Sequence, residues 1–136
     1  MIIRQIKFGW CSLCFDNTGV KINASYLTDI FDDLIHMCEE YLNRKTASCY
    51  FDEEGTTAVL CLTPDEAYII FNKNTLCLVK LKEAPEEIIK DIINDLLSHI
   101  EDMCALDIDY ETLSDEEKDI KRVSYKRRLD NLSKKI

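Results

Sequence analysis

The chain has 136 residues, a length that suits one domain with a single hydrophobic core. Its 46% of apolar residues and 32% of charged residues are typical of a globular protein and argue against a disordered chain. No apolar run approaches the roughly 20 residues that cross a bilayer, and the net charge of −9 opposes binding to nucleic acid or to an anionic membrane.

The first expected elements are a β-hairpin and a helix. Residues 6–15 are rich in apolar, aromatic and sulfur-containing side chains, and the turn sequence Asp-Asn-Thr-Gly separates them from the β-prone residues 20–22. In residues 23–43, apolar side chains recur at the helical period within an arc of about 140°. We expect an amphipathic helix here, with Asn23 or Ser25 as its N-cap.

The polar face of this helix carries a cluster of acidic side chains. Carboxylates spaced three or four residues apart are neighbours on a helix and repel one another, and no Lys or Arg lies between Lys21 and Arg44 to relieve the repulsion. The cluster is either a solvated surface that the fold tolerates or a docking surface for cations on a partner. In the second case, the candidate partner-binding residues are Asp29, Asp32, Asp33, His36 and Glu40.

From residue 46 to residue 82 the pattern changes to short β-prone runs divided by turn signals. The runs are residues 46–51, 57–62, 67–71 and 76–82. Each divider is short enough for a hairpin, so the sequence predicts a four-stranded antiparallel meander. The first divider is acidic, and it adds a second group of candidate partner-binding residues at a hairpin tip: Asp52, Glu53 and Glu54.

Two helices are expected after the meander. Pro85 lies near the start of the first, which has apolar residues over half its circumference from Ile88 to Ile100 and is predicted to pack across the sheet. The spacing of Ser114 and Glu117 is that of a capping box and predicts the second. The fold class is therefore α+β, with an N-terminal β-hairpin, an amphipathic helix, a four-stranded antiparallel meander, and two C-terminal helices packed on the sheet. A further acidic stripe is expected on the first C-terminal helix, formed by Asp91, Asp95 and Asp102.

The charge is divided unevenly along the chain. Residues 1–117 carry nine Lys and Arg against 24 Asp and Glu, a balance of −15, whereas residues 118–136 carry eight against two, a balance of +6. We interpret residues 1–136 as one domain with an acidic body and a basic C-terminal helix or tail. The tail and Tyr110 would suggest nucleic-acid binding if they stood alone. Because the tail is tethered to an acidic body, we favour an intramolecular or solvated use of its cations over nucleic-acid binding.

The sequence contains no motif for catalysis or cofactor binding. Cys11 and Cys14 form a Cys-x-x-Cys in a predicted strand, whereas a redox pair needs a helix N-terminus and a zinc site needs further ligands. The two histidines are His36 and His99, and His36 lies about 160° around its helix from Cys38, so these two side chains cannot form a Cys-His dyad. We therefore expect no catalytic site, no metal and no cofactor.

The cysteines and the N-terminus indicate the compartment. The seven cysteines are an odd number and mostly lie in apolar runs, as expected of free, buried thiols in a reducing environment. The N-terminus has no charged start followed by an apolar stretch and a cleavage site, so no signal peptide is expected. We expect a cytoplasmic protein.

Three segments resemble a pattern in small bacterial proteins. They are residues 22–29, with the sequence Ile-Asn-Ala-Ser-Tyr-Leu-Thr-Asp, then Asp33-Leu34, and later Phe51-Asp52-Glu53. Some of these proteins are thought to act as immunity proteins for polymorphic or contact-dependent toxins. The resemblance covers about residues 6–80, and the chain has Glu-Glu-Gly where the pattern has Glu-Pro-Gly at the hairpin tip. It implies a cytosolic antidote that binds a toxin domain and blocks its active site or substrate path.

Two other functions remain open at this point. One is a small regulatory or ligand-sensing domain in which the sheet and the first C-terminal helix enclose a pocket. The other is an enzyme with a site assembled from scattered carboxylates, for which the sequence has no local motif. The leading hypothesis is an immunity protein that binds a basic toxin domain, such as a nuclease, through its acidic surface. The sequence does not determine the oligomeric state.

Overall fold

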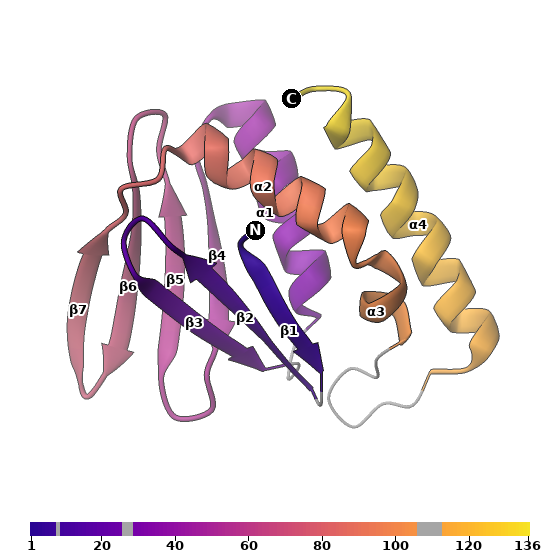
Figure 1. The fold of residues 1–136 in the computed structure, drawn as a ribbon, viewed down its shortest axis with the longest axis horizontal. Helices are drawn as coiled ribbons and strands as arrows, with labels where there is room; N and C mark the ends of the chain where they lie inside the picture. Colours follow the sequence, from indigo (N-terminus) through magenta and orange to yellow (C-terminus); the bar gives the residue numbers. More distant parts are fainter. Residues whose placement is uncertain (8, 26–28, 106–112) are drawn as a thin grey trace.

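A computed structural model describes residues 1–7, 9–25, 29–105 and 113–136. Within these residues the chain forms two antiparallel sheets and four helices (Figure 1). The strands are β1 (Ile3–Lys7), β2 (Trp10–Phe15), β3 (Val20–Ser25), β4 (Ala47–Asp52), β5 (Thr57–Leu62), β6 (Ala67–Lys73) and β7 (Thr75–Lys80). The helices are α1 (Ile30–Arg44), α2 (Pro85–Ser98), α3 (Ile100–Ala105) and α4 (Asp115–Ser133). Tyr110 and the predicted helical residues 26–28 lie outside the described residues.

The first sheet has the order β1-β2-β3 and contains the predicted N-terminal hairpin as β2 and β3. The prediction of one strand over residues 6–15 was wrong, because β1 and β2 are separate antiparallel strands. Gly9 has a φ of 77°, a conformation that favours glycine and allows the chain to turn between them. The strand pairing places Ile3, Leu13 and Ile22 side by side in the core.

The helix α1 begins later than its apolar pattern predicted. Asn23 and Ser25 belong to β3, where pairing with β2 satisfies the backbone, so neither caps the helix. The N-cap is Asp29, whose carboxylate accepts a hydrogen bond from the N–H of Asp32 at 3.1 Å. The helix ends at Arg44, and the C-cap Lys45 has a φ of 61° and donates its N–H to the carbonyl of Tyr41.

The second sheet has the order β4-β5-β6-β7 and is the predicted meander. Alternate residues of β4, β5 and β6 enter the core, as Phe51, Leu60 and Ile69 do. The edge strand β4 packs against α1 and contacts β3. The other edge strand, β7, is exposed at nearly every residue.

The helices form a layer beside the sheets. The predicted continuous helix from residue 85 onward ends at Ser98 with His99 as its C-cap, and the short helix α3 follows it. Figure 1 shows α4 on the side of the molecule away from β7, with α1 and α2 between α4 and the second sheet. The main contacts of α4 are with α1, α2 and α3, whereas the main contacts between helices and sheets are those of α1 with β4 and of α2 with β1. The predicted α+β class and the order of its elements are confirmed. None of the helices in the described ranges has both the length and the apolar character of a membrane span.

Candidate partner-binding surface

The predicted acidic face of α1 is partly covered by α4. At its start, the Asp29 carboxylate caps α1, accepts a hydrogen bond from the hydroxyl of Tyr125, and lies 3.3 Å from the ammonium nitrogen of Lys121. Burial, and secondly the hydrogen bond to Asp29, raise the pKa of Tyr125, so its hydroxyl remains a donor at neutral pH. Asp29 therefore joins α1 to α4, and its charge is compensated within the molecule.

Arg128 joins the same two helices one turn further along α4. Its guanidinium lies 2.5 Å from Asp32 Oδ1 and 2.5 Å from Glu39 Oε1, and its side chain is only 24% exposed. Hydrogen bonds to Glu39 and then to Asp32 raise the pKa of Arg128. The repulsion between the carboxylates of α1 is therefore relieved by a cation about 90 residues away in the sequence. The residues near the helix give no signal for this cation.

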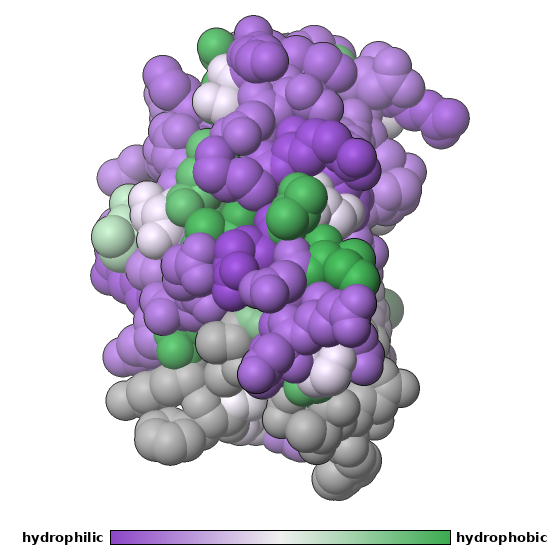
Figure 2. All heavy atoms as spheres, turned by 90° about the vertical axis from the view of Figure 1, so that its right-hand side faces the viewer, coloured by the Kyte–Doolittle hydropathy of each residue, from purple (hydrophilic) through white to green (hydrophobic). Residues whose placement is uncertain are grey.

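Other cations of the basic tail also pair with nearby carboxylates. Arg122 Nε lies 3.0 Å from Glu101 Oε2 at the start of α3. Together with Lys121 and Arg128, it supports the intramolecular use of the tail that we favoured from the sequence. The outward side of α4 is mostly hydrophilic, with separate apolar patches (Figure 2), and Ile120 and Val123 are exposed there.

Two candidate residues of α1, His36 and Glu40, face solvent. His36 is among the more exposed side chains of the helix, with an exposed fraction of 67%, and its Nε2 lies 3.6 Å from Glu40 Oε1. Asp33 is half-buried on the same helix. The five predicted residues of α1 are therefore divided between the α1–α4 contact, which holds Asp29 and Asp32, and the surface beyond it.

At the tip between β4 and β5, neutral hydrogen-bond donors hold two carboxylates in place. Asp52 accepts a hydrogen bond from the N–H of Glu54 at 2.7 Å. Glu53 accepts one from the N–H of Asn23 in β3 at 3.1 Å and one from the hydroxyl of Thr56 at 3.2 Å. These donors fix the tip and tie it to the first sheet without cancelling its charge, and no described Lys, Arg or His forms an ion pair with it.

The tip and the first turn of α1 point toward the same end of the molecule (Figure 1). The tip is defined here as Asp52, Glu53 and Glu54. Within the described residues, the carboxylates of Asp52 and Glu53 are the part of the predicted acidic surface that is held in place by hydrogen bonds without an ion pair to a cation, and the exposed Glu54 lies beside them. An ordered cluster of like charges can bind a matching set of cations with little loss of conformational entropy.

The cysteines do not form a reactive pair in the described part of the chain. Cys11 and Cys14 are three residues apart on β2 and leave it on opposite faces. Burial raises the pKa of Cys11 to about 12, and burial followed by the charge of Glu39 raises that of Cys38 to about 12. These thiols stay protonated at neutral pH. Across the described residues, no three or more His, Cys, Asp or Glu side chains are grouped so as to hold a metal ion.

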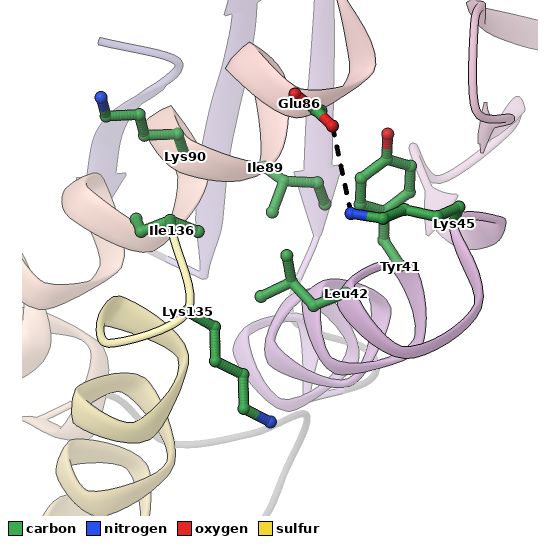
Figure 3. A pocket seen from close by; sticks show the side chains of 8 residues that line it. All are labelled: Tyr41, Leu42, Lys45, Glu86, Ile89, Lys90, Lys135 and Ile136. Carbon is green, nitrogen blue, oxygen red and sulfur yellow. Dashed lines mark ion pairs between the residues drawn. The ribbon is translucent and has the colours of Figure 1, made fainter.

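A hollow of about 240 Å³ lies where the end of α1, the start of α2 and the C-terminal residues meet (Figure 3). Leu42 and Ile89 form apolar walls, and Lys45 extends between the helices until its Nζ is 4.0 Å from Glu86 Oε1. The buried hydroxyl of Tyr41, a lining residue, has no hydrogen-bond partner among the described residues. The remaining lining residues are Lys90, Lys135 and Ile136.

Comparisons with protein-family models, curated proteins and solved structures found no match for this chain.

Proposed function

We propose that this chain is a cytosolic immunity protein that binds a cognate bacterial toxin domain and neutralises it without catalysis. The observation that carries the proposal is the tip, where neutral donors hold the carboxylates of Asp52 and Glu53 in place beside the exposed Glu54. A toxin that cleaves nucleic acid needs a basic cleft for phosphates. Carboxylates fixed at the end of a hairpin can occupy such a cleft in place of the substrate.

The distribution of charge supports a docking surface centred on the tip rather than on all of α1. Asp29 and Asp32 are paired with cations of α4, and separating these pairs to bind a partner would leave those cations without their counter-charges. His36 is exposed and Glu40 is partly exposed, and both extend the surface along α1. Half-buried Asp33 lies between the two parts of the helix.

The first experiment is a binding measurement with a candidate toxin domain encoded next to the gene for this chain. The wild-type chain is expected to form a stable complex, with an association rate that falls as salt rises. The double variant Glu40→Lys/Glu54→Lys should lower the association rate about tenfold or more at low salt, because steering depends on charges at the contact.

The matched control is the double variant Glu87→Lys/Asp91→Lys. Both residues are exposed acids of α2, so the control changes the net charge by the same amount at a different place. It should retain most of the association rate. Equal losses for the two double variants would contradict a docking surface at the tip, and the absence of any complex would contradict the proposed function.

The hollow of Figure 3 favours a second candidate function, a small ligand-sensing domain. Its apolar walls and the ammonium group of Lys45 would suit a small amphipathic anion, whereas the ammonium groups of Lys90 and Lys135 point away from the hollow (Figure 3). The position differs from the expected one, because the hollow lies between two helices and the C-terminal residues instead of between a helix and the sheet. Native mass spectrometry of the purified protein tests this alternative: a retained small molecule that is lost in Leu42→Trp would favour it over the antidote.

A further inference from the structure

The edge strand β7 is a regular strand of six residues that exposes apolar side chains. Leu76 is 75% exposed and Leu78 is 64% exposed, and Cys77 between them is also exposed. The register between β6 and β7 continues over six residue pairs without a shift. Natural edge strands are usually protected by proline, bulges, inward charges or a covering element. Apart from Lys80, β7 has none of these among its described surroundings.

The free edge of β7 presents the backbone of alternate residues. The N–H of Leu81 donates to the carbonyl of Ala67 at 2.8 Å, which makes this a hydrogen-bonded pair. Because such pairs alternate in an antiparallel ladder, residues 77 and 79 also bond to β6. The N–H and C=O groups of Leu76, Leu78 and Lys80 therefore point away from the sheet.

The exposed leucine at the centre of β7 belongs to a row across the whole sheet. The row has one residue from each strand of the second sheet, and each residue pairs with the next: Tyr50 in β4, Val59 in β5, Ile70 in β6 and Leu78 in β7. The row lies on the face opposite the core, since the neighbouring core row contains buried Leu60 and Ile69. A second strand added at β7 would extend this apolar row.

We propose that β7 pairs with β7 of a second copy of this chain, antiparallel and about a twofold axis at Leu78. Two four-stranded sheets then form one continuous eight-stranded sheet. In this register Leu76 lies opposite Lys80 of the other copy, and Leu78 lies opposite Leu78. The outward N–H of each of these residues can donate to the outward C=O of the residue opposite it, and the pattern is the same for both copies. Since β4 is the other edge of the sheet, α1 and the tip remain accessible in the dimer.

The charges of β7 are compatible with a second copy in this register. Lys80 is the only charged residue of the strand, and it already pairs with Glu66 of its own chain at 3.1 Å. In the twofold pair, Leu78 lies opposite Leu78 and Lys80 lies opposite Leu76, so no two ammonium groups face each other. β7 has no carboxylate to attract a basic strand and its one cation is already paired, so a second β7 meets no unfavourable charge in this register.

The test is sedimentation equilibrium of the full chain across micromolar to sub-millimolar concentrations. The wild type is expected to sediment as a monomer–dimer mixture. Leu78→Lys places two ammonium groups opposite each other at the twofold axis and should raise the dimer dissociation constant about tenfold or more. The matched control is Tyr50→Lys, which adds the same charge in the same row at the other edge of the sheet and should leave dimerisation unchanged.

A pair of variants at one position tests the register. Leu76→Lys puts a lysine opposite Lys80 twice in each dimer and should weaken the dimer several-fold, whereas Leu76→Glu puts a carboxylate there and should maintain or strengthen it. Circular dichroism confirms that each variant is folded.

Four results would overturn the proposal. They are a monomeric wild type over the full concentration range, a dimer that tolerates Leu78→Lys, dissociation by Tyr50→Lys, and equal effects of the two Leu76 variants. Because the Leu76 pair does not depend on Leu78→Lys, a failure of that variant to fold would still leave the register test decisive.

Discussion

Asp95 is a buried acid that connects α2 to the N-terminal strand. Its Oδ2 accepts hydrogen bonds from the N–H groups of Ile2 at 2.5 Å and Ile3 at 3.0 Å, and the residue is only 8% exposed. Its spacing from Asp91 and Asp102 had indicated a solvent-facing acidic stripe. The structure corrects this, because the first strand begins against α2 and needs an acceptor for amides that no neighbouring strand satisfies there.

Removing this acceptor should destabilise the fold. Asp95→Ala leaves two buried N–H groups without a partner, which is expected to lower the free energy of unfolding by about 2–4 kcal/mol. Asp91→Ala, at an exposed position one turn earlier, should change it by less than about 0.5 kcal/mol. Urea unfolding measures both variants, and equal stabilities would show that Asp95 does not anchor the strand.

At the scale of elements, α4 is held to α1 by polar contacts to an unusual extent. Only Tyr125, Leu129 and Leu132 of its 19 residues are buried, and Tyr125 bonds to Asp29 while Arg128 bridges two acids of α1. The helix therefore has a small apolar contribution to its docking. Its cations also reduce the repulsion within α1, so each helix stabilises the other.

Truncating Arg128 should reveal how much its ion pairs contribute to the free energy of unfolding. Arg128→Ala removes both ion pairs and restores the repulsion between Asp32 and Glu39, so we expect a loss of about 1 kcal/mol after allowance for solvent screening at these partly exposed groups. Arg127→Ala is the control, since its side chain is exposed and adjacent. Hydrogen exchange should show faster exchange in α4 for Arg128→Ala only. Similar exchange rates in the two variants would argue against a role for the ion pairs of Arg128 in holding α4 to α1.

At the scale of the whole molecule, the opposite charges of body and tail are brought into contact. Lys121, Arg122 and Arg128 form ion pairs with carboxylates of the body, so three of the eight cations in residues 118–136 are compensated within the molecule. The field outside the molecule is expected to follow its net charge of −9.

This arrangement predicts that the chain does not bind nucleic acid. Fluorescence anisotropy with a labelled duplex should give a dissociation constant weaker than about 0.1 mM at physiological salt. The variant Asp32→Asn/Glu39→Gln frees Arg128 and lowers the negative charge, so it should bind more strongly than the wild type at low salt. Micromolar binding by the wild type would contradict the proposed use of the tail.

Individual elements show which parts of the fold are predicted by local sequence patterns. The period of the apolar residues predicted most of α1, and the Ser114 to Glu117 spacing predicted the start of α4, where the Ser114 hydroxyl accepts from the N–H of Glu117 at 3.2 Å. The division of residues 6–15 into two strands was missed, since both strands are apolar and only Gly9 marks the turn. The acidic face of α1 was found, but the residues that neutralise it were not.

The sequence by itself determined the α+β class, the order of the elements, the acidic hairpin tip and the opposite charges of body and tail. These depend on periodicity, turn residues and charge counts, which are properties of neighbouring residues. Only the tertiary structure decided that Asp29 and Asp32 hold α4, that Asp95 anchors β1, and that β7 is an open edge. Each of these depends on which distant segments meet, because the partner of a carboxylate or of a strand edge is chosen by packing and not by proximity in the chain.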